Sequence, residues 1–473
     1  MTSDQSIVND NLSLSALNSP PNWNLSNISS LLEMLQCDDE DIVVDTLCTL
    51  QKVASESLFF EPAIVDSLFL REKNFIFSTF DKIGKSSPST AVVTTLARVS
   101  LHPELEIAFI SLVSLCSVLE RNLTALNLLP SPIFPLSSPH QLYSGLSFLA
   151  ALAMKLRIVF SKLLTNLPKN PSHIPKYAQL TRDDPLFITR SLDFCSKSFD
   201  LTLPLIQKSQ KTQADLKTIR DLILFVKEAL TKILATISTV DALIASIPSD
   251  SSPTTPLVSN GDTQIENSLK VLRNECTVFV SHGWGFFVNL TFRIAEPHKF
   301  SFQTALLDDP SFPDLVQNSL QLHHEGIRGN TITAILNVVI DFPSKREELM
   351  KANLVWRMFE TVDFVRLPLS ESETLLHLVD FIFYMFDPLT DDETERFKRY
   401  ALIRDSVFEP AEPFINFIFQ NSDKLILDYE DKTTLQNRLR SIRQHIKNME
   451  LRSDEHVPDV VSELVVGSQI TNV

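Results

Sequence analysis

The sequence predicts an all-α protein in which helix pairs or triplets stack side by side. Glycine supplies only 8 of the 473 residues, whereas tight β-turns and phosphate-binding loops depend on glycine. The 26 prolines cluster between apolar stretches, where proline begins or ends helices. One apolar spacing also recurs at three places in the chain. Such recurrence is typical of units that bury their apolar faces against one another.

The clearest repeated unit spans residues 315–340. A first helix is expected to end near Leu322, and a polar break follows at 323–326. The second helix has apolar residues at relative positions 0, 5, 8 and 11, which follow one stripe of a helix. Three sets share this spacing: Ile327, Ile332, Ile335 and Val338; Ile42, Leu47, Leu50 and Val53; Ile107, Leu112, Leu115 and Val118.

A small hydroxyl residue occupies relative position 4 in every set. These residues are Thr46, Ser111 and Thr331. A small side chain on an apolar helix face lets a neighbouring helix approach closely. We therefore expect each of the three helices to be packed tightly on that face.

These units resemble armadillo or HEAT repeats, and the armadillo-type pattern is the nearer match. The resemblance is clearest over 31–54, 95–120 and 315–340, where an acidic turn precedes an Ile, a small residue and further apolar residues on one stripe. It implies a right-handed superhelix of stacked helix pairs or triplets, an armadillo-like α-solenoid. Proteins of this architecture typically bind other proteins on an extended surface and catalyse nothing.

The sequence departs from the armadillo pattern at two kinds of position. Asn337 stands where the Asn that often lines the armadillo groove is found, but the other two units carry Lys52 and Ser117 there. The glycine usual between the helices is mostly missing, although Gly326 and Gly329 lie near its place. Asn337 is therefore the one candidate for a groove residue of this type.

Length and charge restrict the possible functions. A chain of 473 residues exceeds one compact core, so it holds either two or three domains or an elongated array. The net charge of −16 (42 basic minus 58 acidic residues) disfavours a general nucleic-acid role. The five widely spaced cysteines include no C-x-x-C pair, and those in apolar contexts are typical of buried thiols in a reducing compartment. With no visible signal peptide, we expect a cytoplasmic protein.

An uncharged stretch at 122–154 requires a separate test for a membrane span. It contains no Asp, Glu, Lys or Arg before Lys155, but four prolines between 130 and 139 interrupt it. The apolar helix that remains is about 14 residues long, whereas a span needs about 20. We expect no transmembrane helix.

The chain is predicted to have five parts. These are a disordered segment at 1–27, an N-terminal helical repeat region at 28–247, a Ser/Pro linker or long loop at 248–263, a C-terminal helical repeat region at 264–452, and a disordered tail at 453–473. The two ends are polar and poor in apolar stripes, which is typical of disorder. The linker follows Pro248 and is rich in Ser, Thr and Pro.

Helices in the N-terminal region are expected at 28–57 (a pair), 61–84, 88–128, 141–167 and 210–247. Pro62 and Pro88 stand where helices should begin, and acids at 38–41 favour the positive end of a helix dipole. Prolines at 168–175 end the helix expected at 141–167. The stretch 210–247 has the longest apolar stripe and is either one spine helix or two helices.

The C-terminal region is expected to begin with a helix at 264–293 that is interrupted at 282–285. Two glycines within three residues there indicate a bend, or a groove where another segment packs close to the backbone. Ser370 and Thr390 each precede an acid by three residues, which predicts capping boxes. Asp-Pro pairs at 184–185 and 309–310 also predict helix starts.

The last helix, at 432–452, is a candidate partner-binding element. It carries six basic residues and one acid, a local charge of +5 in an acidic chain. Arg440, Arg443 and Lys447 are the candidate residues for contact with a partner. Three interpretations stay open: the helix docks an acidic partner, pairs with acids of its own chain, or presents a solvated face.

Other polar residues are weighed as candidate sites. His282 to Trp284 and the pair His377–Asp380 are possible parts of an unrecognised active site, although the pair is also typical of polar residues satisfied within a core. Trp284 and Asn337 are further candidates for partner contacts. Adjacent histidines at 323–324 lack a third ligand. We assign no catalytic, cofactor-binding or metal-binding residue.

The sequence therefore predicts a non-catalytic, cytoplasmic scaffold that binds other proteins through helical repeats. Two alternatives remain: a structural subunit of a larger assembly, or a helical enzyme with an unrecognised site. A fold of this class does not by itself name a partner or an oligomeric state.

Overall fold

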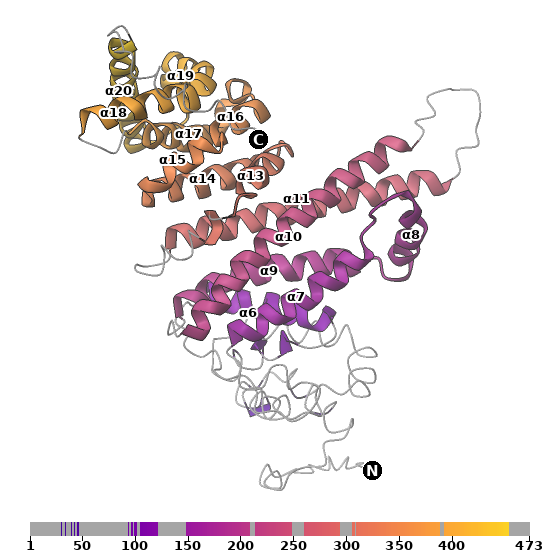
Figure 1. The fold of residues 1–473 in the computed structure, drawn as a ribbon. Coiled ribbons are helices and arrows are strands. Elements are labelled where there is room, and N and C mark those ends of the chain that lie inside the picture. The colour runs from indigo at the N-terminus through magenta and orange to yellow at the C-terminus, as the bar shows by residue number, and fades with distance from the viewer. Residues whose placement is uncertain are drawn as a thin grey trace, which may run out of the picture. The chain divides into compact units, whose positions relative to one another are not determined.

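The computed structural model describes seven continuous stretches and scattered single positions before residue 105. The stretches are 105–121, 148–208, 213–247, 260–293, 305–307, 309–387 and 392–453. Every regular element in these stretches is a helix, and neighbouring helices pack against one another (Figure 1). The predicted all-α class is therefore confirmed for the described residues. The predicted disordered segment at 1–27 and nearly all of the predicted tail at 453–473 lie outside them.

The chain forms two compact units, Met1–Val159 and Phe160–Val473. The division falls inside α7 (Phe148–Asn166) and not at the predicted linker. The linker region lies within the second unit, where the helices on its two sides, α10 (Gln213–Ser246) and α11 (Asn260–Arg293), pack against each other. Residues 248–259 are outside the described residues.

The first unit contains α6 (Leu105–Arg121), which carries one of the repeated apolar sets. All four positions of that set are buried, with exposed fractions of 1% or less. Ser111 Oγ donates a hydrogen bond of 2.8 Å to the Leu96 carbonyl oxygen. A small hydroxyl residue therefore does allow the backbone of another segment to approach α6.

In the repeated set near the N-terminus the prediction for Ile42 is wrong, because its side chain is 37% exposed. The other apolar members of that set are not described.

The second unit contains most of the described helices. In chain order they are α8 (Ile174–Asp183), α9 (Phe187–Lys208), α10, α11, α13 (Phe312–Leu320), α14 (Glu325–Asp341), α15 (Pro343–Lys351), α16 (Leu354–Thr361), α17 (Ser372–Met385), α18 (Glu393–Ile403), α19 (Glu409–Asn421) and α20 (Tyr429–Ser453). A π-helical segment, Arg404–Phe408, joins α18 to α19 ahead of the prolines at 410 and 413. Proline cannot donate the usual backbone hydrogen bond, so a wider turn is a common accommodation.

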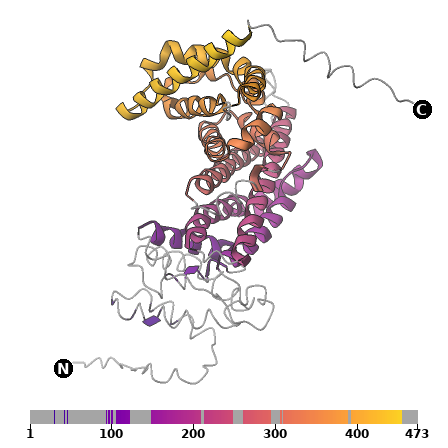
Figure 2. The ribbon, with the colours of Figure 1, turned by 60° about the vertical axis from the view of Figure 1, so that its left-hand side comes forward.

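Helices of the second unit pack in two rows. In the first row α9, α11, α14, α17 and α20 each contact the next helix (Figure 2). In the second row α10, α13, α16 and α19 do the same. Contacts between α10 and α11 and between α13 and α14 join the rows. α11, α14 and α17 thus each lie between two helices of the first row, and α9 and α20 stand at its ends.

The unit at 315–340 folds as its sequence predicts. α13 ends at Leu320 and α14 begins at Glu325, with His323 in the left-handed region (φ 49°) between them. The apolar set on α14 is buried, with no side chain more than 1% exposed. Among the described residues Thr331 Oγ1 forms no hydrogen bond, so this residue contributes its small size and not a polar contact.

Two long helices form the centre of the second unit. α10 is one continuous helix of 34 residues, so the expectation of one spine helix is right and that of two helices is wrong. α11, also 34 residues long, begins at Asn260 and runs through 282–285 without a break. The predicted interruption is wrong, but the alternative of close packing is right. A Cβ added to Gly283 would lie 2.5 Å from Leu230 Cδ2 of α10, so glycine is needed for this approach.

Helix α17 begins differently from the sequence prediction. Ser370 does not cap it; the helix starts at Ser372 and its cap position is Glu371, with no side-chain cap bond. Ser372 Oγ instead accepts a hydrogen bond of 2.9 Å from the Ile426 backbone. Glu371 is buried against Arg328 of α14, with contacts of 3.0 and 2.5 Å. A tertiary ion pair has taken the place of the predicted local cap.

Other helix starts also differ in detail. α18 is capped by Asp392, whose side chain accepts a hydrogen bond from the Glu395 backbone; Thr390 is not described. At the two Asp-Pro pairs, α9 and α13 begin two residues after the proline, at Phe187 and Phe312. Within the described ranges no helix is both long enough and apolar enough to span a bilayer.

Candidate functional site

The basic C-terminal helix, α20, is anchored by one apolar side. Leu435, Leu439, Ile442 and Met449 are buried. Its Arg438 also faces the row, because Arg438 Nε lies 3.1 Å from Asp380 Oδ1 of α17 and the guanidinium carbon is 4.1 Å from the centre of the Phe383 ring. Part of the basic charge is therefore used inside the chain, as one of the three sequence interpretations allowed.

The remaining basic residues of α20 stay on the surface. Arg440, Arg443 and Lys447 are all exposed, and spacings of three and four residues place them on one helix face. Arg440 donates to the Asn437 side chain (3.3 Å) and Arg443 lies 4.6 Å from the centre of the Phe419 ring. In the described part of the chain none of the three forms an ion pair with an acid. We call this set the α20 basic face.

Trp284 is a core residue and not a surface contact. Its side chain is completely buried, its ring packs near Phe287 and Phe312, and Nε1 donates to Ser319 Oγ at 2.9 Å. The sequence placed Trp284 among the candidates for partner binding, but burial removes it from the accessible surface. A buried indole that satisfies its N–H inside the core stabilises the α11–α13 contact.

Asn337 lies at a junction between two helices of the first row. Its side-chain amide donates a 3.0 Å hydrogen bond to Thr291 Oγ1 of α11. Two helical turns towards the N-terminus, Asn330 donates to the Ser281 carbonyl oxygen at 3.1 Å. Both asparagines are partly exposed. They join α14 to α11 and still present part of their amides to solvent.

His377 and Asp380 are satisfied by neighbouring helices and not by each other. His377 Nδ1 lies 2.9 Å from Thr333 Oγ1 of α14, whereas Asp380 pairs with Arg438 of α20. Burial raises the pKa of Asp380, and the charge of Arg438 opposes that rise. Both side chains are partly exposed, and each has its hydrogen-bond partner on a neighbouring helix.

His282 lies beside carboxylates of α9. Its Nδ1 is 3.5 Å from Asp200 Oδ1, and its charge lowers the pKa of Asp193 against the larger effect of burial, which raises it. His324 instead accepts a hydrogen bond from the Ile327 backbone at the start of α14. Over the described ranges no three His, Cys, Asp or Glu side chains are grouped so as to hold a metal ion.

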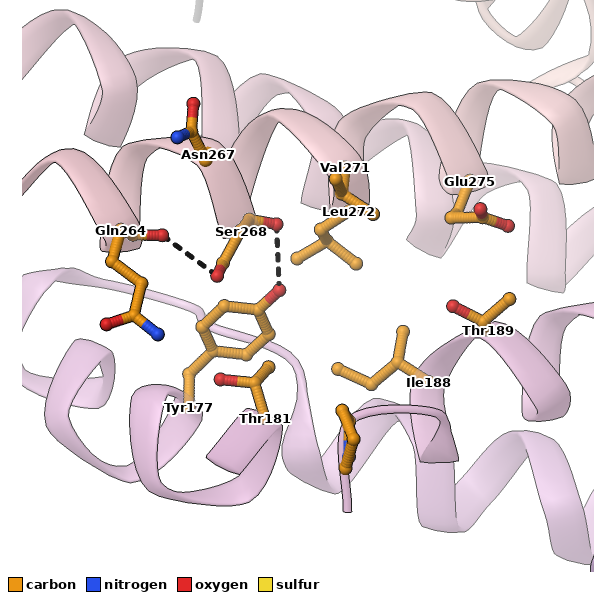
Figure 3. A pocket seen from close by; sticks show the side chains of 11 residues that line it. Tyr177, Thr181, Ile188, Thr189, Gln264, Asn267, Ser268, Val271, Leu272 and Glu275 are labelled. Atoms are coloured by element: carbon orange, nitrogen blue, oxygen red, sulfur yellow. Dashed lines mark hydrogen bonds between the residues drawn. The ribbon is translucent and has the colours of Figure 1, made fainter. Parts of the chain in front are cut away.

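A hollow with a volume of about 650 Å³ lies between α8, α9 and α11. We call it the α8/α9/α11 groove. Figure 3 shows Tyr177 and Thr181 on one wall, Ile188 and Thr189 on another, and a line of α11 side chains facing them. Its α11 side is formed by Gln264, Asn267, Ser268, Val271, Leu272 and Glu275. The size falls within the range of protein sites that hold ligands.

Tyr177 fixes α8 against α11 at the side of this groove. Its ring is almost completely buried, and its hydroxyl donates a 3.1 Å hydrogen bond to the Ser268 carbonyl oxygen (Figure 3). Burial raises the pKa of Tyr177, so the hydroxyl stays protonated and keeps this bond. The wall of the groove is therefore a fixed feature of the fold.

Glu275 makes one end of the groove acidic, and Asp193 lies outside the lining but near enough to act on it. Burial, and after it the negative charge of Asp193, raises the pKa of Glu275. Among the described residues the carboxylates of Asp193 and Glu275 have no hydrogen bond or ion pair. The sequence analysis missed both, since they lie 82 positions apart on two helices. A weaker signal existed in Val271 and Val278, which fall outside the buried stripe of α11 and are 57% and 39% exposed.

Three cysteines lie within the described residues. Cys116, Cys195 and Cys276 are buried and form no disulfide there, as predicted for cysteines in apolar contexts. Burial raises the pKa of Cys276 to about 12, with a further contribution from Glu275, and burial also raises the pKa of Cys195. These thiols stay protonated near neutral pH and are poor nucleophiles.

Comparison with known proteins adds no relative to this picture: the chain matches no protein-family model, no curated protein and no solved structure.

Proposed function

We propose that the chain is a non-catalytic protein-interaction scaffold built as an armadillo-like α-solenoid, and that it captures an acidic protein through the α20 basic face. The two rows of helices in the second unit support the architecture. Repeated packing of this kind presents side chains of successive helices along one extended surface. The right-handed sense of the superhelix and a cytoplasmic location are part of the same proposal.

The observation that carries the proposal is the isolation of the α20 basic face. A chain with a net charge of −16 offers many acids, yet within the described residues Arg440, Arg443 and Lys447 pair with none of them. Arg438, one turn away, is held by Asp380 and two aromatic rings. Basic charge on this helix is thus divided between an internal contact and an exposed face. An acidic partner surface would complement the exposed face and speed association.

Affinity capture of the tagged full-length chain from its native cells tests the proposal. The variant is the triple reversal Arg440→Glu, Arg443→Glu and Lys447→Glu, which leaves the buried side of α20 intact. The matched control is Lys217→Glu, Arg220→Glu and Lys232→Glu on α10, which changes the net charge equally at exposed positions. Quantitative mass spectrometry of the captured proteins is the readout, with circular dichroism as the check on folding.

A stoichiometric partner that the wild type and the α10 control retain, and that the α20 variant loses, supports the proposal. Retention of every partner by the folded α20 variant overturns it. Weaker capture as salt increases is also expected, because exposed charges are screened over about 8 Å at physiological ionic strength.

A further inference from the structure

The α8/α9/α11 groove combines apolar surface with an unpaired acidic end. Val271, at 57% exposure, lies beside Ile188 and Leu272 along the groove. Glu275 follows Val271 by one helical turn, and Figure 3 shows its carboxylate at the end of the groove near Thr189. Exposed apolar side chains that line a hollow are more informative than single apolar residues on a convex surface.

The rim of the apolar part is mainly polar, with one cation, Arg182, in the adjoining hollow at Tyr177 and Thr181. Amide and hydroxyl groups of Gln264, Asn267, Thr181 and Thr189 stand around it. Such groups donate and accept hydrogen bonds in positions suited to a peptide backbone. A wall of this composition favours a polypeptide occupant, whose backbone needs both donors and acceptors.

The acids at the end of the groove determine which charge a bound segment should carry. Asp193 of α9 and Glu275 of α11 are partly buried and have no hydrogen bond or ion pair in the described part of the chain. Lys197 of α9 lies 3.9 Å from Asp200, and the charges of His282 and Lys197 both lower the pKa of Asp193 against the larger effect of burial. A cation placed at the end of the groove would therefore be attracted by Glu275, which forms no ion pair within the described residues, and more weakly by Asp193, whose charge His282 and Lys197 already offset in part.

We propose that the α8/α9/α11 groove binds an extended segment of a partner protein in which a large apolar residue is followed two positions later by Lys or Arg. The spacing follows from the groove. Val271 and Glu275 are separated by about 6 Å along the helix axis. In an extended peptide, side chains two positions apart point the same way and are about 6.6 Å apart. The apolar side chain then covers Val271 and Ile188 while the cation reaches Glu275.

This inference does not depend on the α20 basic face. The groove lies at α8, α9 and the N-terminal half of α11, whereas the basic face belongs to the last helix of the row. The groove prefers a basic segment and the α20 basic face prefers an acidic surface. If the experiment on one site contradicts its proposal, the proposal for the other site is unaffected. The two tests use different variants and different probes.

Fluorescence anisotropy with the purified full-length chain tests the groove. The probe is a fluorescein-labelled nine-residue peptide with Phe-Ser-Lys at its centre and Gly and Ser elsewhere. Two comparison peptides replace the centre by Phe-Ser-Glu or Ala-Ser-Lys. The variants are Glu275→Lys and Val271→Asp, both at partly exposed positions. Glu266→Lys, on the same helix but outside the groove lining, is the control with the same change of charge.

The wild type and Glu266→Lys are expected to bind the Phe-Ser-Lys peptide about tenfold more tightly than either comparison peptide. Glu275→Lys should reverse the preference and favour Phe-Ser-Glu, an outcome that an unfolded variant cannot produce. Val271→Asp should weaken the Phe-Ser-Lys peptide by about tenfold.

Three results would overturn the proposal. One is equal binding of the Lys and Glu peptides by the wild type, or binding of neither. A second is binding of anilinonaphthalene sulfonate in the groove, abolished by Val271→Asp, without peptide binding, which would assign the groove to a small apolar ligand. A third is self-association that Val271→Asp abolishes, which would show that a second copy of this chain occupies the groove.

Discussion

The two halves of α11 share one helix but differ in their surroundings. From Phe279 to Leu290 the helix is enclosed: Gly283 touches Leu230 of α10, and Trp284 is completely buried. From Gln264 to Val278 the helix leaves apolar surface uncovered, most of all at Val271. Packing density is thus distributed unevenly along one continuous element. The enclosed half fixes the row of helices, and the open half is free to bind.

The largest predicted difference between the halves is the change in the free energy of unfolding when an apolar side chain is truncated, Trp284 in the enclosed half and Val271 in the open half. Trp284→Ala removes a buried ring and the hydrogen bond that the ring donates to Ser319 Oγ, so we expect a loss of about 4 kcal/mol in the free energy of unfolding. Val271→Ala, in the open half, should change it by less than about 0.5 kcal/mol. Urea unfolding followed by circular dichroism measures both. Similar losses for the two variants would contradict the division of α11 into an enclosed and an open half.

A pair of glycines gives a smaller but sharper comparison. In Gly283→Ala the new methyl group meets the buried Leu230 side chain at 2.5 Å, so overpacking should cost about 1–3 kcal/mol, partly offset by the better helix propensity of alanine. In Gly285→Ala the nearest atom is Asn330 Nδ2 at 3.6 Å, an ordinary contact. That variant should be neutral or more stable by up to about 1 kcal/mol.

Thermal unfolding of the two glycine variants side by side provides the test. A melting temperature below wild type for Gly283→Ala and at or above wild type for Gly285→Ala is expected. The reverse order would show that α10 and α11 do not approach each other at Gly283.

The smallest predicted effect concerns the pH dependence of the open half. Burial, and then Asp193, raises the pKa of Glu275, so the folded chain holds this proton more tightly than the unfolded chain. Protonated Glu275 therefore stabilises the folded chain. This contribution is fully present below the ordinary carboxyl pKa and is lost as pH rises through the raised pKa of the folded chain. Glu275→Gln removes that loss. Its gain over wild type should therefore grow from acid to neutral pH, staying below about 1 kcal/mol because the group is only partly buried and solvent screens its charge.

Glu266→Gln is the matched control for this pH series. Its carboxylate lies 2.6 Å from Lys270 on the same helix, so the amide removes a favourable surface pair and should lower stability slightly at neutral pH. Melting temperatures of both variants between pH 4 and pH 8 measure the contrast. A Glu275→Gln curve that runs parallel to wild type would contradict the electrostatic description of the groove.

Periodicity in the sequence identified most described helices, because a buried stripe is a local property of the chain. The apolar set of α14 and the buried side of α20 are examples. Local patterns failed where a distant residue decided the outcome. Ser370 looked like a cap, but Ile426 and Arg328 fix the start of α17 through Ser372 and Glu371.

The candidate sites were also predictable only where local sequence patterns define them. Two glycines within three residues predicted an interruption, yet they let α10 approach a continuous α11, and this depends on Leu230 some 50 positions earlier. Trp284 looked available for a partner because nothing local showed that α13 covers it. The groove is built from three helices and has no contiguous signature; only the off-stripe position of Val271 marked it. The exposed face of α20 was predictable because basic residues at helical spacing define it locally.

Site-specific photo-crosslinking in native cells tests the central claim, that the chain captures proteins through one face of its last helix. Benzoylphenylalanine at Gln444, an exposed position between Arg443 and Lys447, is compared with the same group at Leu224, an exposed position on α10. The scaffold account predicts a discrete crosslinked protein from position 444 and none from position 224. No product at 444, or the same products from both positions, would contradict it.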